Sequence, residues 1–324
     1  AAVAQTQARP SLGLFGTPGL IDMPTASATP DAQISVTVAH FRGISRTTIG
    51  FQLTPHILAA IRYSAHGNPT YNYDRSLDFS YHVMDERGAW PSLAVGMRDV
   101  LGTGWYSGEY LVATKSLGTR VKITGGLGWG RLGSYNSFKN PLSVFGSGFN
   151  TRPTGTLGMG GIPAYNKWFR GPAAFFGGVQ WQTPIVRLLF KAEYSSDAYT
   201  RETSPPAILK RRSSLNFALT YQFKNGASLS GYYIYGDRIG FSGSVTLNPK
   251  NPANASSIGP APQPVLSRPD DRPYDTTWTK QRDGASILRQ NMRLLLKREG
   301  LGLEALTITA TRAEVWFSNA RFGA

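Results

Sequence analysis

The stretch that decides the fold is Ser214-Leu215-Asn216-Phe217-Ala218-Leu219-Thr220-Tyr221, in which apolar side chains alternate with polar or small ones. Successive side chains of a β-strand point to opposite faces, so this alternation gives the strand one apolar and one polar face. The same period of two recurs at residues 48–53 and 187–194. The chain is therefore expected to be all-β. Because soluble sheets also alternate, the lengths of the loops must identify the kind of sheet.

Twelve segments carry strand patterns. They lie at residues 34–41, 47–53, 57–63, 76–83, 92–98, 105–115, 120–129, 174–182, 186–194, 213–223, 227–235 and 240–247. Tight connections follow the second, sixth, eighth and tenth strands, and the long ones, including 64–75, 130–173 and 195–212, follow odd-numbered strands. The short connections after the fifth and eleventh strands are exceptions.

This sorting of the loops is typical of an antiparallel up-and-down transmembrane β-barrel, here of about 12 strands, with short periplasmic turns and long external loops. Both ends of the barrel would then be periplasmic, in the outer membrane of a Gram-negative bacterium. A soluble sandwich with Greek-key connections remains the alternative. Tyrosine or tryptophan ends several apolar columns, as expected of aromatic girdles at the lipid–water boundary. These residues are Tyr63, Trp129, Trp181, Tyr194, Tyr221 and Tyr235.

Composition agrees with a barrel. No window approaches 18 consecutive apolar residues, whereas a spanning strand needs only about 9–11 residues. The chain has no cysteine, which excludes a disulfide framework and a thiolate metal site. Residues 1–8 resemble the mature end that remains after removal of a signal peptide.

Four regions follow from these patterns. Residues 1–31, rich in Gly, Pro and Thr, are expected to be an N-terminal periplasmic lead-in or a plug segment, and residues 32–247 form the outer-membrane barrel. Residues 248–282 are a linker, and residues 283–324 begin a small periplasmic α/β module. The module combines a helix at 285–298 with strands at 303–309 and 313–318. It would bury little core, so the polypeptide is expected to continue beyond Ala324.

The net charge of +15 calls for an anionic partner. The basic residues do not cluster on a predicted helix, and no zinc-finger or RNP motif is present, which argues against nucleic acid. On the polar face of the strands, seven bases against three acids predict a positively charged lumen, and rings of Arg and Lys select anions. The inward candidates are Arg62, Arg98, Lys115, Arg120, Lys122, Arg187 and Lys191, with Asp78, Glu109 and Glu193. On a soluble sandwich they would instead lie on the solvent face.

Four basic residues in the predicted external loops, Arg152, Arg170, Arg211 and Arg212, are further candidates. They would contact either an anionic polymer or the phosphates of lipopolysaccharide. The glycine-rich segment 130–173 is long enough to fold inward and close the channel.

No catalytic chemistry stands out. The four histidines lie in separate segments without metal-ligand spacing. No nucleophile elbow or P-loop is present, and Asp78, Glu109 and Glu193 form no obvious carboxylate pair. The sequence therefore predicts no enzyme, no metal and no cofactor.

Several motifs together resemble the YjbH-type outer-membrane proteins associated with exopolysaccharide and capsule production. They are FGTPGLIDMPTA at 15–26, DRSLD at 74–78, GGLGWG at 125–130, FGGVQW at 176–181, KAEYSSDAY at 191–199 and TLNP at 246–249. The resemblance spans almost the whole chain. It implies a barrel from a polysaccharide secretion locus that works with periplasmic and outer-membrane export proteins. It also implies a longer protein with a second, similar barrel, and it provides no catalytic residues.

The main hypothesis is an outer-membrane barrel that takes part in secretion or surface anchoring of an anionic exopolysaccharide through a basic lumen. In the first alternative, a closed structural barrel anchors a periplasmic module to the polysaccharide export machinery. In the second, the chain is a soluble basic binding protein. The predicted partners are the lipid bilayer, lipopolysaccharide, an anionic polysaccharide and export proteins.

Overall fold

The computed structural model of the protein describes residues 9–67, 71–155, 161–204, 207–250, 281–309 and 312–319. The chain divides into two compact units between Lys250 and Asn251. Each unit is described by itself.

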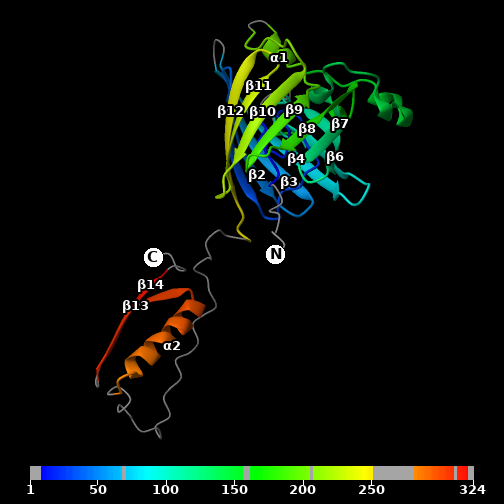
Figure 1. The fold of residues 1–324 in the computed structure, drawn as a ribbon. Helices are drawn as coiled ribbons and strands as arrows, with labels where there is room; N and C mark the ends of the chain where they lie inside the picture. Colours follow the sequence, from blue (N-terminus) through cyan, green and yellow to red (C-terminus); the bar gives the residue numbers. More distant parts are fainter. Residues whose placement is uncertain are drawn as a thin grey trace. The chain divides into compact units, whose positions relative to one another are not determined.

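The first unit is a closed barrel of twelve antiparallel strands, each paired with its neighbours in sequence, and β12 pairs with β1 (Figure 1). The barrel confirms all twelve predicted strands. They are β1 (Ile34–Phe41), β2 (Ile44–Gln52), β3 (Ile57–Gly67), β4 (Tyr71–Met84), β5 (Ser92–Arg98), β6 (Gly108–Leu117), β7 (Val121–Trp129), β8 (Ala173–Gln182), β9 (Leu188–Tyr194), β10 (Leu215–Gln222), β11 (Ala227–Ile234) and β12 (Arg238–Leu247).

The predicted long loop at 64–75 is wrong, because β3 continues to Gly67 and β4 begins at Tyr71. Alternation persists through this region. Ser64 and Asp74 are paired and buried inside the barrel, while the rings of Tyr63 and Tyr73 stack on the outside. These polar residues are therefore part of two strands rather than of a loop.

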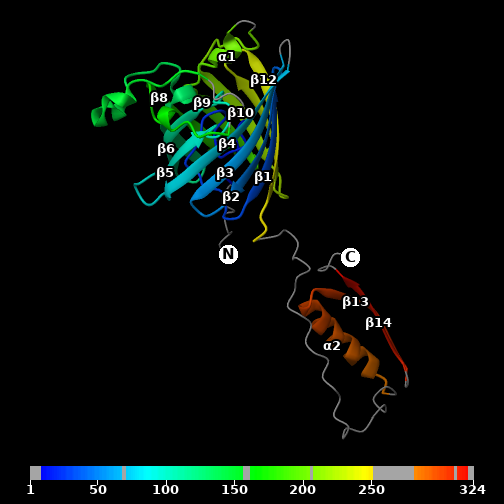
Figure 2. The same cartoon turned by 180° about the vertical axis from the view of Figure 1, so that it is seen from behind.

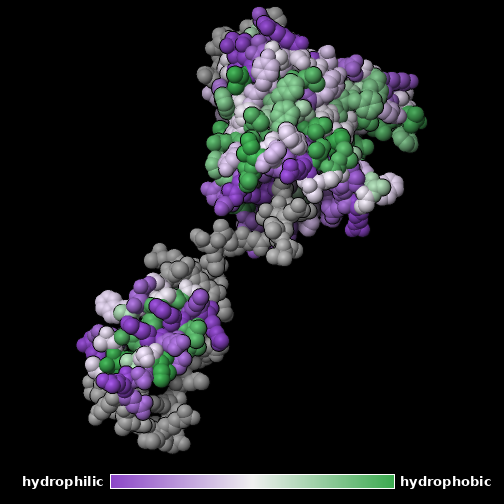
Figure 3. All heavy atoms as spheres, in the orientation of Figure 1, coloured by the Kyte–Doolittle hydropathy of each residue, from purple (hydrophilic) through white to green (hydrophobic). Residues whose placement is uncertain are grey.

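The apolar face of the strands is the outer face. On β10, Leu215 is 49% exposed and Leu219 is 52% exposed, whereas Asn216 and Thr220 are buried. Hydrophobic residues spread over the visible outer face of the barrel, with hydrophilic ones gathered toward its ends (Figure 3). This arrangement is the reverse of a soluble sheet, which buries its apolar face, and it argues against the soluble alternative.

Two predicted girdle residues are wrong. Tyr63, Trp181 and Tyr221 are exposed on the outside. Trp129 and Tyr235 are instead buried, at points where their strands end and the loops cover them. The indole N–H of Trp129 donates a hydrogen bond to Asn140 Oδ1 (3.0 Å).

Residues 9–31, here called the plug segment, lie inside the barrel as a loop that enters and leaves at one rim (Figure 2). We call this rim, where β1 begins and β12 ends, the terminal rim, and the opposite one the loop rim. Arg9 donates to Phe223 O, and Asn248 Nδ2 donates to Asp31 O (3.0 Å), so both ends of the plug segment lie at the terminal rim.

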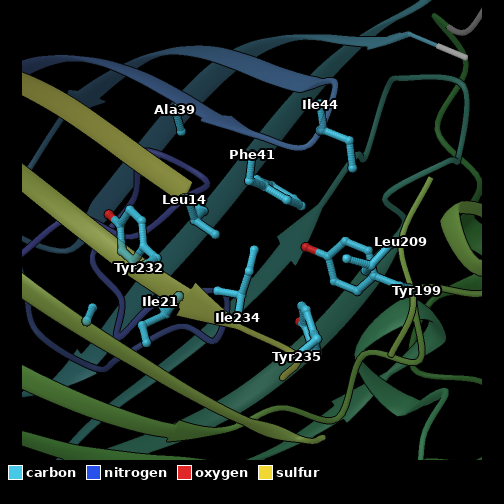
Figure 4. Close-up of a cluster of buried hydrophobic side chains, with 11 residues drawn as sticks. Leu14, Ile21, Ala39, Phe41, Ile44, Tyr199, Leu209, Tyr232, Ile234 and Tyr235 are labelled. Carbon is cyan, nitrogen blue, oxygen red and sulfur yellow. The ribbon is translucent and has the colours of Figure 1, made fainter. Parts of the chain in front are cut away.

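Apolar side chains of the plug segment complete the core. Leu14 and Ile21 pack into a cluster with Phe41, Tyr232 and Ile234 of the barrel wall (Figure 4). Met23 and Ala26 belong to a second cluster, whose other members are Ala94, Tyr110, Val112, Leu132 and Phe176. The core of this barrel therefore lies between its wall and its own N-terminal segment.

The connection between β7 and β8 carries four 3-10 helices, η1 (Gly130–Gly133), η2 (Pro141–Phe145), η3 (Ser147–Phe149) and η4 (Tyr165–Lys167). Leu132 of η1 is buried at the loop rim, whereas Val144 and Phe145 are exposed. Between β9 and β10 a short helix, α1 (Thr200–Thr203), covers the same rim (Figure 1).

The second unit contains the helix α2 (Gly284–Arg298) and a two-stranded antiparallel sheet of β13 (Leu301–Ile308) and β14 (Ala313–Asn319). The helix and both strands of the predicted module are confirmed, each within two residues. Most of the predicted linker, residues 251–280, lies outside the described residues, as do residues 1–8. No described helix is both long enough and apolar enough to cross a membrane.

Candidate functional site

Two neighbouring inward residues of β9 hold the backbone of the plug segment. Glu193 Oε2 accepts hydrogen bonds from the N–H groups of Ile21 (2.8 Å), Asp22 (2.9 Å) and Met23 (2.9 Å). Lys191 Nζ donates to Leu20 O (2.7 Å) and Gly19 O (3.2 Å). Hydrogen bonds with one charged partner are the strong ones, so these two side chains fix the innermost turn of the segment.

Asp22 is the buried carboxylate at the centre of the lumen. The Tyr199 hydroxyl donates to Asp22 Oδ2 (2.7 Å), and the Tyr235 hydroxyl donates to the same oxygen. Arg46 NH1 lies 3.6 Å from Oδ1, and Arg98 NH2 donates to the Asp22 carbonyl (2.8 Å). The wall therefore contacts this one plug residue through its side chain, its carbonyl and its N–H.

Three buried arginines surround the ring of Phe15, which also belongs to the plug segment. We call Arg46, Arg62 and Arg98 the arginine layer; their Cζ atoms lie 4.2, 4.7 and 3.8 Å from the ring centroid. Guanidinium groups at such distances are attracted to an aromatic face. In addition, Arg62 forms an ion pair with Asp78 (2.9 Å).

A second set of ion pairs closes the loop rim. Arg131 of η1 binds Asp197 (2.6 Å) and Glu202 (2.8 Å), and its Cζ lies 4.4 Å from the ring centroid of Tyr199. Arg152 binds Glu109 (2.7 Å). Arg131 of the loops therefore contacts the same tyrosine that donates to Asp22. The ion pairs of the loop rim thus adjoin the contacts that hold the plug segment.

Burial affects the pKa values of the acidic side chains at the loop rim. It raises the pKa of Asp197 to about 6, although Arg131 opposes the shift. Burial, with Asp74 nearby, raises the pKa of Asp99 to about 7. Burial alone would also raise the pKa of Glu202, but Arg131, a backbone hydrogen bond and Arg46 together hold this pKa below the ordinary value.

Most of the predicted inward residues lie either around the plug segment or at the terminal rim, and Glu109 is buried at the loop rim. Arg62, Arg98, Lys191, Asp78 and Glu193 are buried together around the plug segment. Lys122 points inward near the terminal rim, as its pairing with Ser116 and Gln180 requires, while Arg120 and Arg187 lie in turns at that rim.

The inward prediction for Lys115 is wrong. Tyr110, Val112 and Thr114 take the inward positions of β6, so Lys115 shares the outer face with Leu111 and Leu117. It forms an ion pair with Glu86 (2.9 Å) near the terminal rim.

The predicted loop bases are placed differently from one another. Arg152 forms an ion pair with Glu109, as described above. The Arg211 Cζ lies 3.5 Å from the ring centroid of Tyr135, and its guanidinium donates to Asp197 O (3.0 Å). Arg212 is exposed and Arg170 is half-buried.

The predicted excess of positive charge in the lumen stays a prediction. Among the described residues, the buried acidic side chains outnumber the buried basic ones. The acids are Asp22, Asp74, Asp78, Asp99, Glu109, Glu193, Asp197 and Glu202, and the bases are Arg46, Arg62, Arg98, Lys167 and Lys191. Three of these acids, Glu109, Asp197 and Glu202, form ion pairs with the half-buried loop residues Arg152 and Arg131.

Sequence reasoning missed four central residues, Asp22, Arg46, Tyr199 and Tyr235. Arg46 continues the alternation of β2 and precedes the strand predicted from 47. Asp22 and Tyr199 fall within two of the family-like motifs, 15–26 and 191–199. The presence of these residues in two motifs is the feature of the sequence that could have indicated a contact between the motifs.

Between the plug residues Thr17 and Thr25 and the wall residues His56, His82 and Tyr110 lies a small pocket of about 20 Å³ that opens to solvent. Among the described residues, no group of three or more His, Asp and Glu side chains is placed to hold a metal ion.

Comparison with solved structures gives three barrels that this chain covers with 66% of its length. The NanC porin has 9% identity, a TM-score of 0.35 and 98% of its chain covered; the KdgM porin has 9%, 0.37 and 97%. The N-terminal β-barrel domain of Pseudomonas aeruginosa OprF has 12%, 0.19 and 96%.

Comparison with known sequences gives a closer similarity. The chain is 30% identical over 251 residues to "Uncharacterized lipoprotein YjbH" of Escherichia coli (strain K12), with 74% of this chain and 35% of that protein covered. It thus spans about a third of the length of this relative. Residues 11–324 match the family described as "Exopolysaccharide biosynthesis protein YbjH". The chain therefore belongs to the YjbH family of exopolysaccharide biosynthesis proteins.

Proposed function

We propose that this chain is an outer-membrane barrel of an exopolysaccharide export system, closed by its own N-terminal segment. Three observations support the membrane assignment. The barrel has no open edge, its outer face is apolar, and its polar side chains are turned inward. A sheet can lie in lipid only when it closes and satisfies its backbone hydrogen bonds internally. With the terminal rim in the periplasm, the long loops face the outside.

The main support for the closed state is the set of contacts that bind the plug segment inside the barrel. Glu193 and Lys191 bind its backbone, and Asp22 is bound by Tyr199, Tyr235 and Arg46. Extraction would leave these buried charged groups without their partners, which costs roughly 1–3 kcal/mol or more for each group. In this state the barrel acts as a structural anchor and does not conduct.

The second unit is the part through which such an anchor would act. On this proposal it lies in the periplasm and docks onto export proteins, while the barrel fixes it to the membrane. The role is not enzymatic, because the buried titratable groups are used to hold the plug segment and the loops.

Planar-bilayer recording, combined with a secretion assay, tests this proposal. The full chain should be heat-modifiable on gels, fractionate with the outer membrane and show no steady conductance. An internal deletion of residues 284–319 should abolish polysaccharide secretion and leave heat modifiability and the closed state unchanged. Steady conductance of the unaltered chain would contradict the closed state, and normal secretion by the deletion variant would contradict the anchoring role.

A further inference from the structure

The plug segment supplies binding partners for two wall arginines. The described contacts of the Arg46 guanidinium are Asp22, the Tyr199 hydroxyl (3.2 Å) and aromatic faces, and Arg46 Nε has no hydrogen-bond partner. The described hydrogen bond of Arg98 is to the Asp22 carbonyl. Only Arg62 of the arginine layer is paired with a carboxylate of the wall, Asp78. The wall on its own therefore leaves Arg46 and Arg98 without a carboxylate.

Removal of the plug segment would make this layer electropositive. Arg46 would lose the Asp22 carboxylate and Arg98 would lose the Asp22 carbonyl, so both guanidinium groups would keep their positive charge without these partners. An anion is the group that such a layer would bind.

The geometry around Asp22 specifies the kind of anion. One carboxylate oxygen accepts from two tyrosine hydroxyls, and the other faces a guanidinium. Next to it, Lys191 donates to two carbonyls, and Glu193 and Asn216 present polar groups in hydrogen-bonding positions. The site thus binds one carboxylate with donors and acceptors beside it, and a sugar acid offers a carboxylate flanked by hydroxyl groups.

We infer that Arg46, Arg98, Tyr199 and Tyr235 form a binding subsite for the carboxylate of an acidic polysaccharide, which Asp22 occupies when the plug segment is in place. This inference rests on the proposed function and adds a substrate class to it. Asp22 stands in for the sugar carboxylate, and Phe15 occupies the space between the arginines. The polymer and the plug segment therefore compete for one site, so the polymer binds only when the segment withdraws toward the terminal rim.

Competition makes a definite prediction for Asp22→Asn. The substitution removes the competing charge and leaves the wall intact, so the fraction of molecules able to bind rises. The probe is a short oligomer of glucuronic acid, with the matched glucose oligomer as the neutral control, and titration calorimetry on the full chain in detergent is the readout. The acidic oligomer should bind Asp22→Asn at least about ten-fold more tightly than the unaltered chain, and the neutral one should show no such gain.

Two further variants keep the result interpretable. Arg46→Gln in the Asp22→Asn background should lose the gain, since a charge-assisted hydrogen bond accounts for about ten-fold or more in affinity. Asp31→Asn, which changes an acid of the same segment at the terminal rim, should behave as the unaltered chain. Heat-modifiable migration of each variant shows that it is folded.

A reversible lock tests the competition independently of Asp22. The Ala26 N–H donates to Thr114 Oγ1 (3.0 Å), and the chain has no cysteine of its own. The double variant Ala26→Cys/Thr114→Cys, combined with Asp22→Asn, should lose acidic-oligomer binding when oxidised and regain it when reduced.

Equal binding of both oligomers, no gain in Asp22→Asn, or no effect of the lock would overturn the inference. Outer-membrane fractionation and the closed state of the unaltered chain do not involve the oligomer. They would therefore show whether the proposed function stands when the inference fails.

Discussion

The carboxylate of Glu193 accepts the backbone N–H of Asp22 at 2.9 Å, although the two residues are 171 positions apart in the chain. Both residues are acidic and buried, yet their side chains serve different partners. Glu193 binds three successive N–H groups, and the Asp22 carboxylate turns toward Arg46 and two tyrosines. The plug segment is thus held through its backbone by one residue and through its side chain by a separate set.

Glu193→Gln should loosen the innermost turn of the plug segment. The amide retains one acceptor oxygen but loses the charge, and its NH2 group would face N–H donors. We expect a loss of about 1.5–3 kcal/mol in local opening free energy. Hydrogen exchange of the Ile21, Asp22 and Met23 amides measures it. Glu86→Gln, at the partly exposed pair with Lys115, is the control and should leave these amides protected. Unchanged exchange in Glu193→Gln would show that the backbone contacts do not hold the segment.

Arg131→Ala should destabilise the loop rim severely. It leaves the buried carboxylates of Asp197 and Glu202 without their cation, and breaking a buried pair in this way costs about 3–5 kcal/mol. Urea unfolding followed by heat-modifiable migration reports the loss. Arg212→Ala removes an exposed guanidinium from a neighbouring loop and should change stability by no more than about 0.5 kcal/mol. Equal effects of the two substitutions would contradict the role of Arg131.

Asp99 should make the barrel less stable as the pH rises toward neutrality. Burial raises the pKa of this carboxyl to about 7, whereas it is about 3.9 in an unfolded chain. The folded state therefore binds the proton more tightly. The stabilisation is complete below about pH 4 and is lost as the pH rises through 7, by up to about 4 kcal/mol.

Asp99→Asn keeps an acceptor for the Tyr106 N–H (2.9 Å in the unaltered chain) and removes the titration. The difference in unfolding free energy between the unaltered chain and Asp99→Asn should therefore change steadily between pH 4 and pH 7, in the direction that favours the variant at higher pH. A difference that is independent of pH would contradict the burial of this carboxyl in the folded state.

Leu219→Lys should oppose insertion into lipid. Leu219 lies in the middle of β10 and is 52% exposed on the outer face, where a lysine near the bilayer midplane costs roughly 2–4 kcal/mol. Folding into phospholipid vesicles, measured against urea, gives the cost. Ile185→Lys is a matched control, because this exposed side chain lies in a tight turn at the terminal rim. If both lysines cost the same, the outer face of β10 does not contact lipid.

The fold could be predicted from the sequence because the alternation of side chains marks each strand, and the lengths of the loops indicate how the strands are connected. The alternation of residues 214–221 is a property of single side chains, and it survives in β10 with each residue on its expected face. The error at Lys115 has the same origin, since a shift of one residue in the assumed register moves a side chain to the other face.

The contacts between the plug segment and the barrel wall could not be predicted from the sequence in this way. Pairing of Asp22 with Arg46 or Tyr199 depends on the path of a segment that has no regular period, and no spacing within the sequence encodes it. Of the predicted inward bases, Lys115 lies on the outer face and Arg120 and Arg187 lie in turns, whereas Arg62, Arg98 and Lys191 are buried inside. Their partners come from the plug segment and from the wall, so the sign of the lumen could not be summed from strands alone.

The central claim is that the plug segment fills the lumen, and the reactivity of single cysteines tests it most directly because the chain has none of its own. Met23 is 1% exposed inside the barrel, whereas Pro30 of the same segment is exposed at the terminal rim. In the folded protein, Met23→Cys should react with a polar maleimide at least about a hundred-fold more slowly than Pro30→Cys, a margin equivalent to about 2.7 kcal/mol of protection. Both should react alike after unfolding. Equally fast reaction of the two cysteines in the folded barrel would contradict the account.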